Sequence, residues 1–205
     1  MRVKRPTTLV AMAATVAMVV SLAACGRDAT VTNMDCGQGE VGQVTIRPHE
    51  ADDEPTVTVG IPDWVTQTQY GALEDGSADE QVSCSADDVG ILYEYASDDP
   101  ESFVGYYLDE GNLEQLHLFA DRYTNVRFGT VQHQNVNGAD VVWSWYSYDD
   151  EYGRANVYYV SATTIDGGYC LEVTVSQIKL DKDAKVSIDE STLWEVWDQV
   201  SLGRG

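Results

Sequence analysis

Basic residues are scarce in this chain of 205 residues, which has 12 Lys and Arg against 34 Asp and Glu and a formal net charge of −22. A nucleic-acid partner needs a positively charged surface to meet its phosphates. A surface as acidic as this one repels nucleic acid and anionic lipid headgroups, so we exclude DNA and RNA as the natural partner. The acids are spread along the chain, which is typical of a solvated exposed surface.

The sequence also lacks the motifs of common active sites. The three histidines, His49, His117 and His133, have no metal-ligand spacing such as HExxH. No GxSxG marks a serine nucleophile, and the glycines at 37–42 are not followed by the lysine of a phosphate-binding loop. We therefore predict no metal, no cofactor and no enzymatic activity.

Long apolar runs are limited to Leu9–Ala24. These sixteen residues are too few to span a bilayer, which takes about 20. Basic residues precede the run, and no acidic residue occurs before Asp28. A basic start, an apolar centre and small residues at the end predict an export signal over residues 1–24.

The run closes on Leu22-Ala23-Ala24-Cys25, which resembles the lipobox of bacterial lipoproteins. The resemblance implies cleavage after Ala24, a diacylglyceryl group on the Cys25 sulfur and acylation, for example by palmitate, of the new amino terminus. It places the protein on the extracytoplasmic face of the cell membrane, held by its lipid. The alternative is a secreted protein with an ordinary signal. Because three basic residues leave with the signal, the mature chain has a net charge of −25.

Composition divides the remainder into an acidic tether over residues 25–54 and a single domain over residues 55–205. The tether is polar and rich in Thr, Gly and Asp, and it would lift the domain off the membrane. Val41–Arg47 is an exception, because its alternation also fits a short strand.

Four cysteines are present, and lipidation of Cys25 leaves three for one disulfide. Thiols outside the membrane tend to oxidise. We favour Cys84 with Cys170, because both lie in strand-like sequence whereas Cys36 lies in the tether. The two pairings that involve Cys36 stay open.

Alternating apolar residues predict strands at Val57–Ile61 and Val89–Tyr95, the first closed by a Pro62-Asp63-Trp64 turn. Asp99-Pro100 starts a helix, and a second helical stripe follows Gly111-Asn112. Residues 74–80 read as a loop.

A four-stranded antiparallel meander follows, with the Asn137-Gly138 pair typical of a type I′ turn. Ser187 and Glu190 have capping-box spacing for a last helix. The whole predicts an α+β fold, an antiparallel sheet covered by helices. The meander strands are expected at Asn125–Val136, Asp140–Tyr148, Ala155–Ile165 and Tyr169–Gln177.

Pro55-Thr56-Val57 leading to Ile61-Pro62-Asp63-Trp64 resembles the opening strand and the proline–tryptophan turn of actinobacterial lipoproteins of the LpqN type, which are similar to the PsbP-like fold. The order of elements over residues 55–201 is similar as well. The resemblance implies a PsbP-like sandwich and a cell-envelope binding or accessory protein without a shared catalytic motif.

Aromatic residues crowd the meander, and alternation places them on both of its faces. Tyr and Trp offer wide stacking surfaces that suit sugars, peptides or lipid tails. The alternative is a core on one face and ordinary strand residues on the other. The candidate binding surface consists of Trp64, Trp143, Trp145, Tyr146, Tyr148 and Tyr158.

We therefore predict a lipid-anchored, non-enzymatic binding or accessory module of the bacterial cell envelope, with a glycan, lipid or protein ligand. One alternative is an envelope glycoside hydrolase with two carboxylates about 5–9 Å apart. Another is a structural assembly partner with a large apolar patch. Asp149-Asp150-Glu151 is a candidate weak calcium site, for which a solvated turn is the simpler interpretation.

Overall fold

The structure, a computed structural model, describes residues 42–47, 56–72, 78–96, 99–109, 123–165, 168–179 and 184–202. The expected export signal, Cys25, Cys36 and the second helical stripe lie outside these residues, as do His49 and His117. In the described ranges, no helix combines the length and the apolar character that crossing a membrane requires.

The described strands form one eleven-stranded sheet. Its order is β11-β2-β1-β4-β5-β10-β9-β8-β6, with β3 paired to β4 and β7 to β8. The pairings are antiparallel except for the brief contact of β1 with β4. The strands are β1 (Gln43–Ile46), β2 (Val57–Gly60), β3 (Gln67–Ala72), β4 (Ala78–Ala86), β5 (Val89–Ala96), β6 (Thr124–Phe128), β7 (Gln132–Val136), β8 (Ala139–Asp149), β9 (Ala155–Ile165), β10 (Tyr169–Ile178) and β11 (Val200–Leu202).

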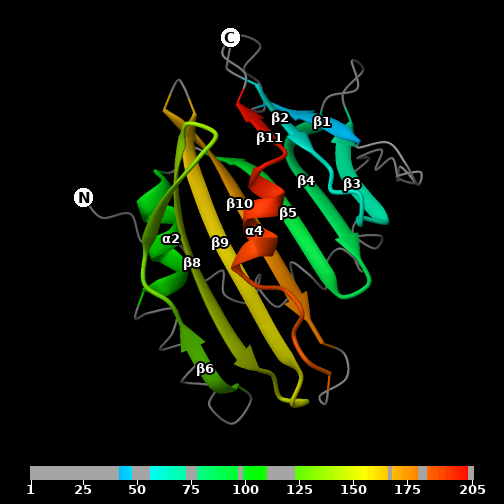
Figure 1. Ribbon diagram of the computed structural model, residues 1–205, viewed down its shortest axis with the longest axis vertical. Helices are drawn as coiled ribbons and strands as arrows, with labels where there is room; N and C mark the ends of the chain where they lie inside the picture. The colour runs from blue at the N-terminus through cyan, green and yellow to red at the C-terminus, as the bar shows by residue number, and fades with distance from the viewer. Residues whose placement is uncertain are drawn as a thin grey trace.

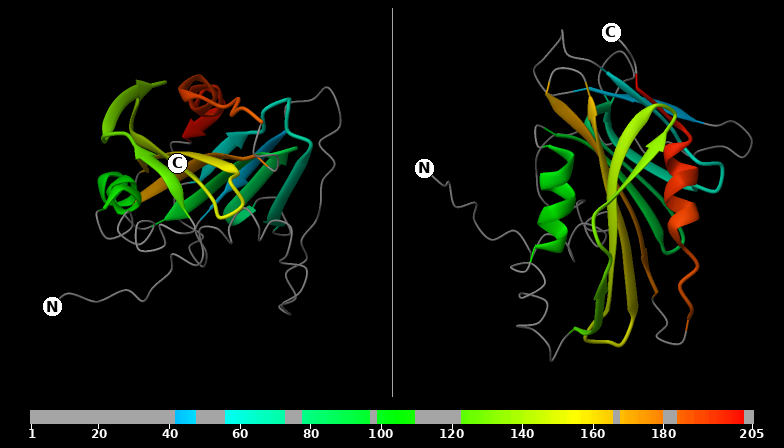
Figure 2. Two further views of the ribbon diagram at one scale, coloured as in Figure 1. Left: turned by 90° about the horizontal axis from the view of Figure 1, so that it is seen from below. Right: turned by 60° about the vertical axis from the view of Figure 1, so that its left-hand side comes forward.

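The predicted α+β class is confirmed, although sheet outweighs helix more than the sequence indicated. The described helices α2 (Pro100–Leu108) and α4 (Glu190–Trp197) are short. α4 lies in front of the long strands in Figure 1, and the turned view in Figure 2 shows α2 on the opposite face. The central strands β8, β9 and β10 are therefore covered on both sides.

α4 packs on the larger of the two cores. Its buried side chains include Leu193, Val196 and Trp197. The Trp197 indole donates a hydrogen bond to the Ser161 hydroxyl at 2.9 Å, and that hydroxyl donates to the Val173 carbonyl at 2.9 Å. The polar atom of a fully buried tryptophan is thus satisfied, as a dry core requires.

α2 covers a second, smaller core that is built mainly of tyrosines. The rings of Tyr107, Tyr146, Tyr158 and Tyr148 follow one another with centroid distances of 6.1, 4.7 and 6.1 Å, each pair nearly parallel. Phe103 of α2 is buried against this row. Each stacked aromatic pair contributes about 0.5–1.5 kcal/mol in addition to the free energy gained from burying its apolar area. The row therefore stabilises the packing of α2 on the sheet.

The predicted meander is present as β7–β8–β9–β10 in unbroken antiparallel register. Asn137 (φ 52°) and Gly138 (φ 89°) both have the left-handed conformation of a type I′ turn, as predicted. The strand expected at 125–136 is in fact two strands. β6 and β7 share one edge of β8, and the register slips by one residue between them, which is the mark of a bulge.

The folded part begins earlier than predicted. Alternation in Val41–Arg47 correctly indicated a strand, and β1 pairs with β2 and β4 inside the sheet. Val44 and Ile46 are buried there. The assignment of this stretch to the tether is therefore wrong, because its two apolar side chains complete the core beneath β2.

The last helix begins at a different cap from the predicted one. Asp189 is the N-cap, and its carboxylate accepts from the Ser191 N–H at 2.9 Å. The other half of the capping box is Thr192, whose hydroxyl accepts from the Asp189 N–H. Ser187 instead accepts a hydrogen bond from the Gln177 side chain. The helix ends at Trp197, and Val200 already lies in β11.

Two glycines give a matched test of this backbone. A Cβ at Gly105 in α2 or at Gly138 in the β7–β8 turn would meet no atom within 4 Å. Only Gly138 has a positive φ. We expect Gly138→Ala to destabilise the protein by about 1–2 kcal/mol and Gly105→Ala to stabilise it by about 0.5–1 kcal/mol. Urea unfolding of both variants measures the difference, and equal effects would contradict the turn assignment.

Candidate functional site

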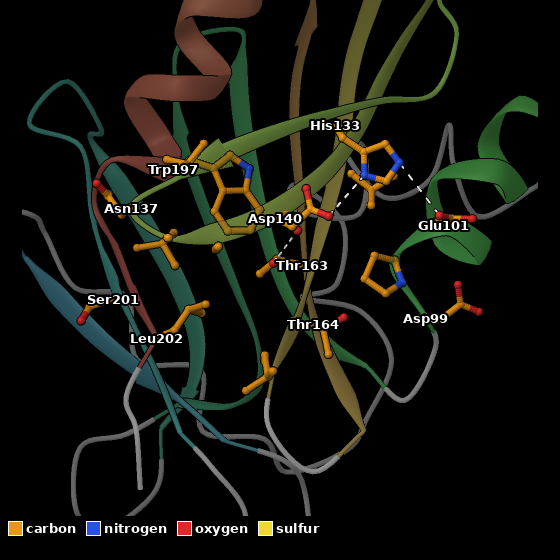
Figure 3. Close-up of a pocket in the computed structure, with 17 residues that line it drawn as sticks. Asp99, Glu101, His133, Asn137, Asp140, Thr163, Thr164, Trp197, Ser201 and Leu202 are labelled. Carbon is orange, nitrogen blue, oxygen red and sulfur yellow. Dashed lines mark hydrogen bonds and ion pairs between the residues drawn. The ribbon is translucent and has the colours of Figure 1, made fainter.

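A groove of about 720 Å³ crosses the end of the sheet where the β7–β8 turn, the end of β9 and β11 come together. Figure 3 shows Asp99 and Glu101 on one side of it, Ser201 and Leu202 on the other, and Asp140, Thr163 and Thr164 between them. Its size is that of a small-molecule or peptide site. No single stretch of the sequence indicates this groove, because its lining comes from six separate elements.

Carboxylates gather on the α2 side of the groove. His133 lies between two of them, with Nδ1 3.4 Å from Asp140 Oδ2 and Nε2 3.9 Å from Glu101 Oε1. Asp99 caps α2, and its hydrogen bonds from the Ser102 side chain and N–H hold the pKa of its carboxyl below the ordinary value. Among the residues that the structure describes, the groove lining includes no Lys or Arg. This wall therefore presents an excess of negative charge.

The rest of the groove is apolar with hydroxyl groups. The buried apolar residues of the lining are Val142, Ile165 and Trp197, which we call the floor. Val142 belongs to the core under α2 and the other two to the core under α4, so the groove runs over the end of the sheet from one face to the other. The Thr163 hydroxyl donates to the Asp140 carbonyl at 2.8 Å, which holds the start of β8 against the end of β9. Thr164 is exposed and points toward the open space. An apolar floor with a polar, acidic rim can hold the body of a ligand and orient a polar or cationic part of it.

The predicted aromatic binding surface does not form. Trp143, Tyr146, Tyr148 and Tyr158 are all buried, because α4 covers one face of the meander and α2 the other. Each ring packs inside one of the two cores and has no free face for a ligand. Alternation identified correctly which residues share a face, but not that both faces are covered.

The two remaining candidates are half-buried and lie apart from the groove lining. Trp64 lies in the predicted turn, which is closed by a hydrogen bond from the Val65 N–H to the Pro62 carbonyl at 3.0 Å. Its indole donates to Glu195 Oε1 at 3.1 Å, so it links the turn to α4. Trp145 lies under the main chain at Gly129. Both are explained by packing.

The favoured disulfide is also wrong. Cys84 lies opposite Ile91 of β5, and Cys170 lies opposite Ala96 of the same strand. Residues directly opposite share a face, and successive residues alternate between faces. The two thiols are therefore on opposite faces of the sheet and several residues apart along β5, well beyond the reach of a disulfide.

The acidic turn after β8 does not offer a calcium site. Asp150 accepts from Arg154 Nε and pairs with its Nη2, both at 2.7 Å. Its other oxygen accepts from the N–H groups of Tyr152 and Arg154. A carboxylate that is already paired with a guanidinium is a poor ligand for a second cation. In the part of the chain that the structure describes, no three His, Cys, Asp or Glu side chains come together as a metal site.

The acidic wall is poorly arranged for glycoside hydrolysis. Such enzymes hold two carboxylates on either side of the sugar that they cleave. Here the imidazole of His133 lies between Glu101 and Asp140, in the space that a sugar ring would need. Of the three histidines, His133 lines the groove, whereas His49 and His117 lie outside the described residues.

No protein-family model matches the chain, and no curated protein sequence matches it. Among solved structures, the chain is similar to the solution structure of the cyanobacterial PsbP protein CyanoP from Synechocystis, with 12% sequence identity and a TM-score of 0.41. The match covers 82% of this chain and 97% of CyanoP. The resemblance to LpqN-type lipoproteins stays a prediction.

Proposed function

We propose that this protein is a lipid-anchored binding module of the bacterial cell envelope, without enzymatic activity, and that its ligand occupies the groove at the end of the sheet. The groove is the main support for this proposal. It combines a buried apolar floor with a charged rim, and such a combination binds and orients a ligand without chemistry on it.

The anchor is supported by the sequence around Leu22-Ala23-Ala24-Cys25. A lipidated Cys25 followed by a polar stretch would hold the domain near the extracytoplasmic face of the membrane. Anionic lipid headgroups would repel the acidic surface of the domain, so the domain would not bind to the membrane surface directly. Under this arrangement the groove meets glycan, lipid or protein of the envelope rather than nucleic acid.

The proposal is tested by affinity capture on intact cells with three forms of the full chain. We expect the wild type to carry acyl mass at Cys25 and to retain envelope material. Cys25→Ser should lose the acyl mass and leave the membrane fraction, whereas Cys36→Ser should do neither. Thr164→Trp should keep the acyl mass but lose most of the retained material, because an indole at this exposed position fills the groove.

Two results would contradict the proposal separately. An unmodified Cys25 in mass spectrometry of the native product would remove the anchor. Full retention by a folded Thr164→Trp variant, compared with Tyr152→Ala at the far end of β8, would remove the groove as the ligand site.

A further inference from the structure

β11 forms one wall of the groove with an open strand edge. Among the described strands it pairs with β2 alone. The Gln199 carbonyl accepts from the Gly60 N–H at 2.7 Å. Hydrogen-bonded and non-hydrogen-bonded pairs alternate along antiparallel strands. Val200 and Leu202, which fall on the alternate positions, therefore direct their N–H and C=O groups away from β2.

These main-chain groups are spaced like those that receive an added strand. Val200 and Leu202 both line the groove, and their side chains pack on the core behind it. Their outward N–H and C=O groups repeat every second residue, which is the repeat of a partner strand. A sugar or a lipid tail has no matching row of donors and acceptors, whereas an extended peptide does.

The opposite wall selects the charge of the ligand. Asp99, Glu101 and Asp140 line it, and His133 is the one basic side chain among the described groove-lining residues. A second copy of this chain would bring a net charge of −22 to the same place, and this repulsion opposes pairing of two β11 edges. Lys or Arg side chains would meet the carboxylates favourably.

We infer that the groove takes an extended peptide segment that adds a strand to β11 and carries Lys or Arg side chains toward the carboxylates of Asp99, Glu101 and Asp140. This inference rests on the groove being the ligand site proposed above. The partner is thus a basic segment of another envelope protein. Its main chain forms hydrogen bonds with β11, and its positive charges pair with the carboxylates on the α2 side.

The probe is a synthetic peptide of alternating Thr and Lys, about six residues long, the usual length of a strand. We expect it to bind the full chain in a salt-dependent manner, whereas the same peptide with Glu for Lys should not bind. Two N-methylated forms test the strand addition. Alternate residues of an added strand face β11, so methylation at one set of positions should abolish binding and methylation at the other set should spare it.

Protein variants test each wall. Glu101→Gln and Asp140→Asn should each weaken binding about two- to fivefold, as expected for exposed ion pairs, while Glu151→Gln at the far end of β8 should have no effect. Leu202→Pro removes one outward N–H and leaves the ladder with β2 in place, so it should weaken binding several-fold. If Leu202→Pro melts early, the two methylated peptides decide the point alone.

Several outcomes would overturn the inference. Equal binding of the Lys and Glu peptides would remove the charge selection, and equal binding of the two methylated peptides would remove the strand addition. Self-association of the chain that Leu202→Pro abolishes would assign the edge to a second copy. If envelope material is still captured through the groove while the Lys peptide fails to bind, the proposed function stands and only the peptide assignment falls.

Discussion

Alkaline solution should unfold this protein within a narrow range above pH 10, the ordinary pKa of a tyrosine phenol. Burial raises the pKa of five tyrosines well above that value, and neighbouring ionisable groups raise it further. Four of the five form the aromatic row under α2. The five are Tyr93, Tyr107, Tyr146, Tyr148 and Tyr158.

The direction of the effect follows from which state holds the proton. A phenol with a raised pKa in the folded state keeps its proton there while the unfolded chain gives it up. The stability is complete below about pH 10 and falls as the pH rises past it. Each such tyrosine removes about 1.4 kcal/mol per pH unit, so a few of them together cancel a typical stability of about 5–15 kcal/mol within two units.

Tyrosinate absorbance and far-ultraviolet circular dichroism, followed together against pH, measure this transition. The buried phenols, whose pKa values are raised, should ionise in the same step in which the strands are lost. Tyr158→Phe keeps the ring but removes one phenol, so it should make the loss of stability shallower by about 1.4 kcal/mol per pH unit. Ionisation of all tyrosines while the sheet remains intact would contradict the burial of the aromatic row.

Replacing Gln177 by Leu should destabilise the protein by about 3–5 kcal/mol, because several buried groups lose their partners at once. The Gln177 side chain is 1% exposed. Its carbonyl accepts from the Ser187 N–H at 2.7 Å and the Ile188 N–H at 3.2 Å. Its amide donates to the Ser187 hydroxyl at 2.8 Å and to Asp88 Oδ1 at 2.9 Å. One side chain thus fixes the segment that leads into α4.

Asp88 shows the electrostatic side of the same arrangement. Burial raises the pKa of its carboxyl, but hydrogen bonds from Lys179 and Gln177 outweigh that effect and lower the pKa overall. Lys179 Nζ lies 2.9 Å from Asp88 Oδ2, a contact in which Gln177 takes no part. The loss in Gln177→Leu therefore comes mainly from the orphaned N–H groups rather than from the charge of Asp88.

Urea unfolding of Gln177→Leu against Gln134→Leu makes the comparison. Gln134 is an exposed glutamine in β7, and surface changes of this kind fall within about 0.5 kcal/mol. Gln177→Glu keeps the two acceptor bonds but removes both donors and adds a charge beside Asp88, so it should improve as the pH falls. A loss below about 1 kcal/mol in Gln177→Leu would mean that the segment before α4 is held by its apolar contacts alone.

The elements that the sequence predicted correctly are those with local signals. Alternation identified β5 and the strands of the meander, Asp99 and Pro100 identified the start of α2, and Asn137-Gly138 identified the turn. The strands that were not predicted from the sequence are short or lack apolar alternation. β3 ends before the loop predicted at 74–80, and β4 begins inside it at Ala78, so that loop is shorter than predicted; both strands have polar, mixed sequence. β11 has three residues, and its first, Val200, continues the helical spacing of Val196 and Trp197 in α4.

The site was missed because it depends on contacts between distant segments. Asp99 was predicted to start a helix, which is correct, and His133 has no motif around it that would mark a site. Their meeting with β11 depends on how the sheet orders its strands, which no window of the sequence contains. The predicted pairing of Cys84 with Cys170 failed for the same reason. The register of both strands along β5 decides which cysteines are neighbours, and the number of cysteines in the sequence does not reveal it.

Gly129 allows the chain between β6 and β7 to approach the Trp145 side chain closely. A Cβ there would lie 2.7 Å from Trp145 Nε1 and 2.8 Å from its Cδ1, so the chain between β6 and β7 rests directly on the indole. A larger residue would push this crossing outward, and β7, which begins three residues later, would carry His133 with it. The place of His133 in the groove thus depends on a glycine that is not itself part of the groove lining.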